Sequence, residues 1–191
     1  RQANVSRVFE AMGHGALDVV DTPTLGVGNP KDAAAPLLRK ILNIGWLVGQ
    51  QRAPAARSVA APLREASQRR GLVAIGSSAG GPAALEVLLK GLPAAFPAAI
   101  VLVQHVDQVF AAGMAEWLAS ASGLDVRLAR EGEPPQAGAV LLAGTNHHIR
   151  LLKNGTLAYT AEPVNEIYRP SIDVFFESVA SVRGVINSLA A

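Results

Sequence analysis

Two serines occupy a glycine-rich turn in this 191-residue chain, where positions 76–81 read Gly-Ser-Ser-Ala-Gly-Gly. Gly76, Ser78 and Gly80 match the G-x-S-x-G pattern, in which a nucleophilic serine stands on a sharp turn between a strand and a helix. At such a turn the backbone N–H groups and the positive end of the helix dipole can stabilise an oxyanion or bind a phosphate. The turn therefore allows acyl transfer by Ser78 or phosphate binding, and a turn of this composition can also be purely structural.

A histidine can supply the base that a serine nucleophile needs. The apolar run 98–104 predicts a parallel strand buried on both faces, and His105 follows it directly. The run 72–75 predicts another strand before the turn, and 82–91 predicts the helix that joins the two strands in a βαβ unit. Neighbouring parallel strands lie about 4.8 Å apart, so Ser78 and His105 are expected within hydrogen-bond reach at one rim of the sheet.

The remaining periodicities predict a layered α/β protein. Helices are expected at 5–16, 36–48, 107–121 and 171–179, with Asp107 and Ser171 as caps. Further strands are expected at 17–20, 125–129, 139–143 and from 185 onward, and an Asn-Gly turn predicts a hairpin of 148–152 with 156–160. For the N-terminal helix and strand, an irregular N-terminal extension stays open as the alternative. The predicted fold is a mostly parallel, doubly wound (Rossmann-like) sheet with an antiparallel β-hairpin annex, incomplete at the C-terminus.

Composition restricts the functional classes. Half of the residues are hydrophobic and there is no cysteine, which excludes disulfides, thiolate catalysis and cysteine-based zinc sites. The net charge is only +2 and the arginines near 52–70 are scattered, so we expect no nucleic-acid partner. No apolar run approaches the ~20 residues of a membrane span and no signal peptide is recognisable, so we expect a cytoplasmic protein without membrane insertion.

Neither a cofactor nor a metal is expected. The glycines of the turn do not follow G-x-G-x-x-G, no Walker lysine follows them, and the second strand ends in His105 rather than in an acidic ribose ligand. His147 and His148 have no third ligand at suitable spacing. A nucleotide- or phosphate-binding βαβ module stays open as the main alternative to a serine hydrolase, and a non-catalytic docking module stays open as another. An ordinary α/β-hydrolase fits less well because its histidine lies far downstream of the acid.

Several motifs, in order, resemble the catalytic domain of CheB-type chemotaxis protein-glutamate methylesterases, which are response-regulator enzymes. They are 76–82 (Gly-Ser-Ser-Ala-Gly-Gly-Pro), 103–105 (Val-Gln-His), 142–144 (Leu-Ala-Gly) leading into 146–148 (Asn-His-His), and 168–176 (Tyr-Arg-Pro-Ser-Ile-Asp-Val-Phe-Phe). Residues 5–23 also resemble the last helix and strand of a receiver domain. Their sequence is similar to that of the branch of the family that serves Wsp-type pathways. The resemblance implies a receiver remnant at 1–24, an interdomain helix and linker at 25–70, and a truncated methylesterase domain at 71–191.

The resemblance also implies a reaction and a set of site residues. Members of the family hydrolyse glutamate γ-methyl esters on the cytoplasmic helices of chemoreceptors and deamidate certain receptor glutamines, downstream of a sensor kinase. Ser78 matches the family's nucleophile and His105 its general base. Ser77, Ala79, Gly80 and Gly81 form the oxyanion-binding turn, and His148 and Arg169 are expected at the rim of the site.

The chain departs from the family pattern at the site itself. Ala79 stands where the family commonly has a threonine. The family's third triad member is an aspartate in a Gly-Met-Gly-x-Asp-Gly motif after the strand that begins near Val185, and the residues printed here end without it. We interpret Asp107 and Asp173 as helix-start residues and Asp125 as a loop residue rather than as replacements. These 191 residues are therefore expected to be weakly active or inactive, and the longer protein active.

Overall fold

The computed structural model describes residues 2–20, 30–49, 71–183 and 188–190. It separates into two units, one formed by residues 1–19 together with 70–191 and the other by residues 20–69. The domain boundaries predicted near 24 and 70 fall on or beside residues outside the described ranges and stay predictions, as does the linker predicted at 50–70.

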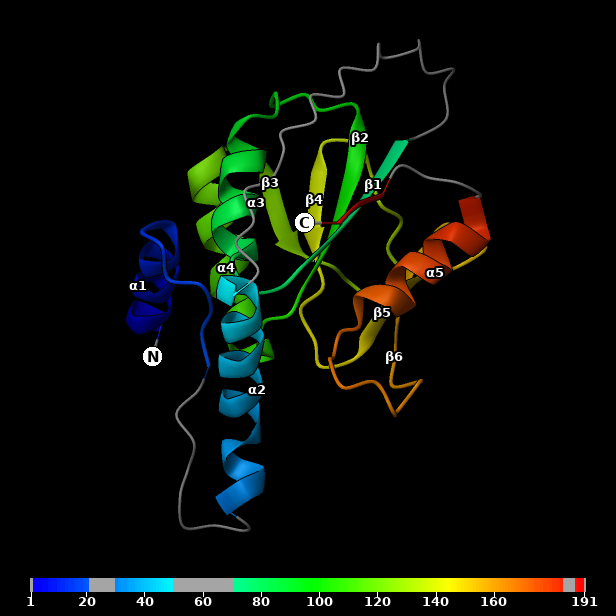
Figure 1. The fold of residues 1–191 in the computed structure, drawn as a ribbon. Coiled ribbons are helices and arrows are strands. Elements are labelled where there is room, and N and C mark those ends of the chain that lie inside the picture. The colour runs from blue at the N-terminus through cyan, green and yellow to red at the C-terminus, as the bar shows by residue number, and fades with distance from the viewer. Residues whose placement is uncertain (1, 21–29, 50–70, 184–187, 191) are drawn as a thin grey trace. The chain divides into compact units, whose positions relative to one another are not determined.

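The first unit is built around a five-stranded sheet with the order β3-β4-β2-β1-β7, in which every pairing is parallel. Figure 1 shows β3, β4, β2 and β1 side by side. The strands are β1 (Gly71–Ser77), β2 (Ala98–Gln104), β3 (Asp125–Leu128), β4 (Ala139–Leu142) and β7 (Ser188–Ala190). The helices α3 (Gly81–Lys90) and α4 (Gln108–Ser122) make the crossovers after β1 and β2. The predicted α/β fold with a mostly parallel sheet is thus confirmed.

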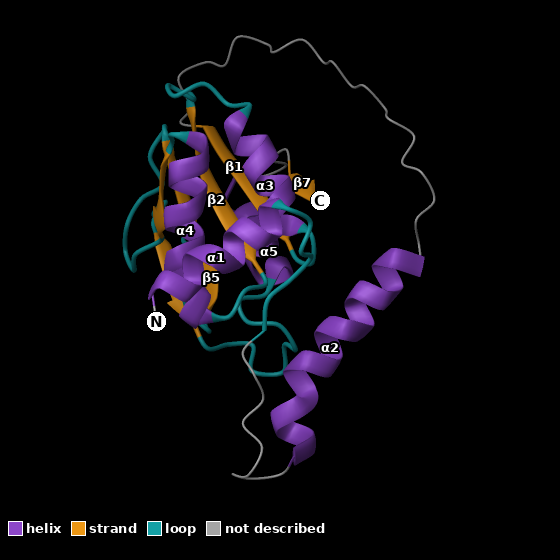
Figure 2. Cartoon of the chain, turned by 90° about the vertical axis from the view of Figure 1, so that its left-hand side faces the viewer, coloured by secondary structure: helices purple, strands orange, loops and turns teal. Residues whose placement is uncertain are grey.

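Each face of this sheet has its own apolar core, as the alternation of side chains along β2 shows. Ile100 and Leu102 point into a cluster with α3 and α4, which cover one face (Figure 2). Val101 and Val103 point into a second cluster on the other face, where α5 (Ile172–Arg183) and the hairpin of β5 (His148–Leu151) and β6 (Leu157–Thr160) lie. A strand buried on both faces has a continuous apolar sequence, which is why 98–104 could be recognised.

The hairpin annex is also confirmed, because β5 and β6 pair antiparallel as a separate two-stranded sheet. Of two further predictions, the one for Asp125 is wrong, and the one for the last strand falls partly on residues that are not described. Asp125 is the first residue of β3 rather than a loop residue. The predicted start of the last strand, near residue 185, lies outside the described residues. The described strand β7 pairs with β1 over Ser188–Ala190.

The N-terminal helix α1 (Gln2–Gly13) packs against the same core as α3 and α4. Phe9 is fully buried and stacks on Trp117 of α4 with ring centroids 5.7 Å apart. The strand predicted at 17–20 is wrong, because this segment has no regular structure and no described strand pairs with it. The carbonyl of Leu17 accepts a hydrogen bond from Gly80 N–H instead, at 2.7 Å.

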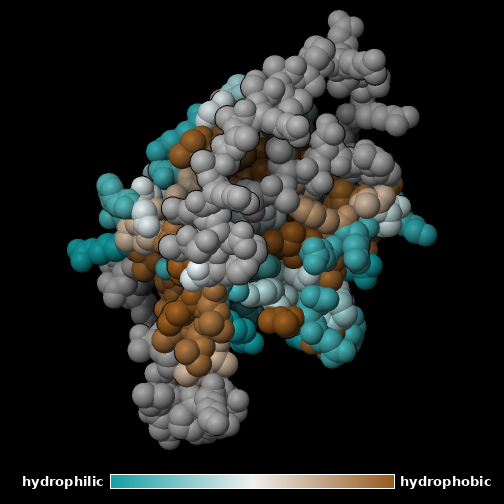
Figure 3. Space-filling view, viewed as in Figure 1, coloured by the Kyte–Doolittle hydropathy of each residue, from teal (hydrophilic) through white to brown (hydrophobic). Residues whose placement is uncertain are grey.

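The second unit contains α2 (Pro30–Gly49), which begins at Pro30 rather than at residue 36 and so includes part of the predicted loop 24–33. Leu38, Ile41 and Leu42 are exposed on it and form an apolar strip that is visible in Figure 3. In the described part of the chain, no helix has both the length and the apolar character needed to cross a bilayer.

Candidate active site

Ser78 and His105 meet at the carboxyl ends of the two central strands. β1 and β2 are paired in register along their whole length, with Ser77 opposite Gln104, so the residue that follows each strand is brought to the same rim. His105 N–H donates to the carbonyl of Ser77 at 3.1 Å. The imidazole Nδ1 then lies 3.2 Å from Ser78 Oγ, which is hydrogen-bond distance for a nucleophile and its base.

Gln104 holds the turn that carries the serines. Its side chain is buried, its Nε2 donates to the carbonyl of Ser78 at 2.9 Å, and its Oε1 accepts from Ser77 Oγ at 2.5 Å. A side-chain amide that both donates and accepts within one turn fixes the orientation of that turn. Gly81 has no side chain because a Cβ there would collide with Gln104 Oε1 and with Ser77.

The same contacts distinguish the two serines. Ser77 is the last residue of β1 and is buried, and its hydroxyl donates a hydrogen bond to Gln104 Oε1. Ser78 lies after the strand, is partly exposed, and is the serine whose Oγ contacts the imidazole. Of these two serines, Ser78 thus combines partial exposure with a neighbouring imidazole.

The turn places backbone donors beside Ser78, although several are already used. Gly80 adopts φ 77°, a left-handed conformation that favours glycine, and precedes the first turn of α3 with Pro82 near its start. Gly80 N–H donates to the carbonyl of Leu17, and Gly81 N–H donates to the carbonyl of Ser78. Ala79 N–H, next to the serine, has no hydrogen-bond acceptor among the described residues and is available for an oxyanion, whereas the N–H groups of Gly80 and Gly81 are already used.

Three aspartates that were candidates for an orienting acid have other tasks. Asp107 caps α4 by accepting from Val109 N–H at 3.1 Å, as predicted. Asp173 lies in the first turn of α5, and Asp125 lies 3.9 Å from the guanidinium Nε of Arg127. No group of three or more His, Cys, Asp or Glu suited to hold a metal occurs among the described residues.

The two residues expected at the rim occupy different positions. His148 is fully buried rather than at a rim, because its ring bridges two backbone groups: Nδ1 accepts from Ser171 N–H at 2.9 Å, and Nε2 lies 3.1 Å from the carbonyl of Pro163. Arg169 is partly exposed, and its guanidinium donates to the carbonyl of Val164 in the same loop.

Two residues at the site were not singled out from the sequence. Gln104 had a signal, since it follows six apolar residues and a polar residue at the end of a buried strand commonly faces a site. Tyr168 had no signal of its own, although it belongs to the motif at 168–176. Its ring stacks on the imidazole of His105 with centroids 4.4 Å apart and planes inclined by 11°.

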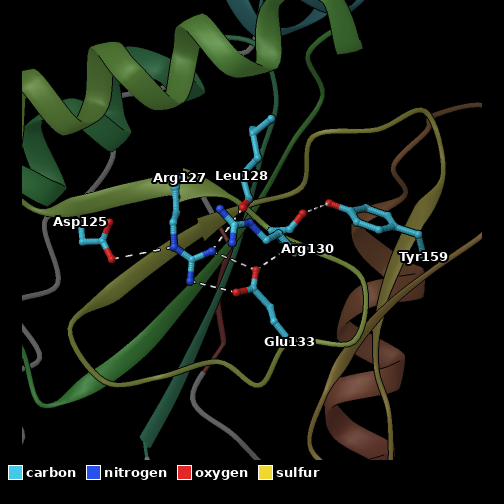
Figure 4. Close-up of polar contacts among 7 residues, drawn as sticks. Asp125, Arg127, Leu128, Arg130, Glu133 and Tyr159 are labelled. Carbon is cyan, nitrogen blue, oxygen red and sulfur yellow. Dashed lines mark hydrogen bonds and ion pairs between the residues drawn. The ribbon is translucent and has the colours of Figure 1, made fainter.

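A polar network joins the end of β3 and the loop after it to the hairpin (Figure 4). The guanidinium of Arg127 holds both carboxylate oxygens of Glu133, at 3.0 and 2.9 Å, and the N–H of Arg130 donates to the same carboxylate. Burial acts to raise the pKa of Glu133, but these hydrogen bonds and the arginine charge outweigh it, so the pKa lies below its ordinary value. The bond to Glu133 in turn raises the pKa of Arg127.

Tyr159 connects this network to the loop after β4. Its hydroxyl donates to the carbonyl of Ala129 at 3.1 Å and accepts from Gly144 N–H at 3.2 Å, and its own N–H donates to Glu131. Burial of the phenol raises its pKa. Gly144 has no room for a side chain, because a Cβ would press against Leu128. The loop that leads to β5 is therefore closely packed on the end of the sheet.

Comparison with known proteins gives a consistent match. Residues 73–190 match the model of a family described as CheB methylesterase. A protein-glutamate methylesterase/protein-glutamine glutaminase of Pseudomonas putida is 91% identical over 180 residues, and one of Pseudomonas aeruginosa is 69% identical over 180 residues. The crystal structure of the Thermotoga maritima CheB methylesterase catalytic domain superposes with a TM-score of 0.59 at 33% identity, covering 64% of this chain and 66% of that one.

The two curated relatives are longer than this chain. The aligned region takes in 94% of this chain but 53% of each of them, so the chain spans about half the length of the curated relatives it matches.

Proposed function

The chain belongs to the family of CheB methylesterases, and we propose that the protein is a serine hydrolase that removes methyl esters from glutamate side chains of chemoreceptors. The observation that carries the proposal is the 3.2 Å contact between Ser78 Oγ and His105 Nδ1 at the carboxyl ends of β1 and β2. The relatives named as protein-glutamate methylesterases support the substrate class.

In the proposed reaction Ser78 Oγ attacks the ester carbonyl while His105 Nδ1 takes the hydroxyl proton. The oxyanion faces Ala79 N–H and the N-terminal end of α3, whose dipole favours negative charge. The C–O bond to the methoxy group breaks, and the proton on His105 goes to that oxygen to give methanol. Water, deprotonated by His105, then cleaves the acyl-enzyme and restores Ser78.

The same groups suit the hydrolysis of a primary amide, in which ammonia leaves in place of methanol. We therefore include deamidation of receptor glutamines, in keeping with the second half of the relatives' names. The proposal also includes action in the cytoplasm on the helices of methylated receptors, and a receiver domain elsewhere in the longer protein that takes its signal from a sensor kinase.

The phosphate-binding alternative is weaker on the geometry of the turn. A phosphate at the start of α3 would need several convergent N–H groups. Gly80 N–H and Gly81 N–H are directed to the carbonyls of Leu17 and Ser78. A serine already paired with an imidazole suits acyl transfer better than phosphate binding.

Labelling with a fluorophosphonate tests the proposal on the chain itself. The reagent is expected to attach to Ser78, and peptide mass spectrometry identifies the modified serine. Ser78→Ala and His105→Gln should abolish or strongly slow labelling, whereas Ser120→Ala, at an exposed position of α4, should not change it. Methanol release from a methylated receptor fragment by the longer protein then tests the substrate. Labelling of another serine, or equal labelling of His105→Gln, would contradict the assignment.

A further inference from the structure

The imidazole of His105 lies against an aromatic ring from a distant part of the chain. Tyr168 stacks on it almost in parallel, with ring centroids 4.4 Å apart and an interplanar angle of 11°. The Nδ1 edge of the same imidazole is the one that contacts Ser78 Oγ. A histidine ring has two soft torsions, and a flat neighbour in contact with its face restricts the rotation that would swing Nδ1 away from the serine.

Tyr168 belongs to a loop between β6 and α5 that is fastened at both ends by one buried side chain. His148 Nδ1 accepts from Ser171 N–H, so the ring proton is on Nε2, which donates to the carbonyl of Pro163. These two bonds tie residues on either side of Tyr168 to the first residue of β5. Arg169 adds a bond within the loop, from its guanidinium to the carbonyl of Val164.

The position of Tyr168 is therefore set by the fold rather than by local sequence. His148 has no exposed surface, and Ser171 beside it is buried as well. Both bonds of the His148 ring go to the backbone, which changes little when exposed side chains of the loop move. These hydrogen bonds hold the loop so that the ring of Tyr168 lies at the rim where β1 and β2 end.

We propose that Tyr168 is a positioning residue for His105. By stacking on the imidazole it holds the ring plane in the orientation in which Nδ1 faces Ser78, and His148 keeps Tyr168 in place by fastening its loop. The role that the stack assigns is one of the aromatic face. The inference rests on the proposed function, since it assigns a support to the base of that reaction.

The stack also suits the charge that the imidazole acquires during the reaction. A cation over the face of a tyrosine is attracted by the negative potential of the ring. When His105 takes the proton of Ser78, the positive charge forms directly against this face. Stacking can therefore lower the barrier as well as orient the base.

Fluorophosphonate labelling of the longer protein that contains these residues, followed against reagent concentration, separates binding from reaction at Ser78. We expect Tyr168→Leu to lower the maximal labelling rate about tenfold, the range given by a lost aromatic stack and a loosened base, with little change in the concentration for half-maximal rate. Tyr168→Phe keeps the stack and should label like the wild type. Ile167→Ala, at an exposed neighbouring position of the same loop, is the matched control and should also label like the wild type.

A ring-current measurement tests the stack without relying on activity or on a variant that folds poorly. Carbon-bound protons of the His105 ring should resonate upfield of those of a free histidine in the wild type and in Tyr168→Phe, with His105→Gln identifying the signals. The upfield displacement should vanish in Tyr168→Leu if that variant keeps its thermal midpoint.

The possible results separate the positioning role of Tyr168 from the proposed hydrolase function. If the wild type is labelled at Ser78 and Tyr168→Leu reacts equally fast, or Tyr168→Phe slows as much as Tyr168→Leu, the positioning role is overturned and the proposed function stands. An unshifted His105 ring in the wild type overturns it too. If the wild type is not labelled at Ser78, both fall together. Loss of rate in Tyr168→Leu alone, with the shifts as expected, supports the inference.

Discussion

Gln104 and Ser77, the last residues of the two central strands, are hydrogen-bonded side chain to side chain at 2.5 Å. The same glutamine donates to the carbonyl of Ser78. One buried amide thus links the strand that leads into His105 to the turn that carries Ser78. The distance between Ser78 and His105 depends on this link as well as on strand pairing.

Replacing Gln104 should damage both the fold and the site. Gln104→Ala leaves the buried hydroxyl of Ser77 and the carbonyl of Ser78 without their partner, which typically costs about 1–3 kcal/mol. We expect a lower urea midpoint and slower fluorophosphonate labelling of Ser78 at a temperature where the variant is folded. Gln136→Ala, at an exposed glutamine in the loop before β4, is the control and should change neither. Wild-type labelling by Gln104→Ala would show that the link is dispensable.

The stack of Phe9 on Trp117 predicts how α1 is held. Phe9 is fully buried, so Phe9→Ala should cost about 3–5 kcal/mol of packing or release α1 from α4. The chain has two tryptophans, and a Trp46→Phe background leaves Trp117 as the only one. In that background Phe9→Ala should shift the tryptophan emission to longer wavelength, while Glu10→Ala, exposed on the same helix, should not. An unchanged emission maximum in Phe9→Ala would contradict the packing.

The central part of the site could be predicted because its signals are local. A continuous apolar run predicts β2, a glycine-rich turn predicts the end of β1, and parallel pairing brings Ser78 and His105 to one rim. Strand formation at 17–20 could not be decided in the same way. An apolar segment becomes a strand only when a neighbouring strand accepts its backbone bonds, and no described strand does so here.

The residues around that pair are set by contacts far apart in sequence. His148 reads as a polar residue near a site, yet it is buried because two backbone groups from the next loop satisfy its ring. Tyr168 meets His105 only because that loop is fastened in this way. The hydrophobic periodicity of the sequence does not predict such contacts, because each depends on the position of a loop without regular structure.

Gly76 marks a close approach between β1 and α5. A Cβ at this position would overlap the side chain of Ile172, which is β-branched and cannot turn aside easily. We expect Gly76→Ala to destabilise the protein by about 1–3 kcal/mol through overpacking. The same change should cost less in an Ile172→Ala background, because the obstructing methyl groups are gone. Equal costs in the two backgrounds, measured by urea unfolding, would argue against the close approach.

Glu133 predicts how stability depends on pH. Burial opposes its charge, but the hydrogen bonds and charge of Arg127 and the N–H of Arg130 lower its pKa in the folded protein. A carboxylate whose folded pKa is below the unfolded value of about 4.3 stabilises the fold above that pH, and the contribution is lost as the pH falls through the folded pKa. Glu133→Gln should therefore reduce the free energy of unfolding at pH 7 by about 1.5–3 kcal/mol, the range for a hydrogen bond to a charged group. The difference from the wild type should shrink in urea titrations below pH 4, whereas Glu116→Gln, exposed on α4, should show no such trend. A difference between Glu133→Gln and the wild type that stays constant from pH 7 to pH 3 would mean that the pair with Arg127 does not lower the pKa of Glu133.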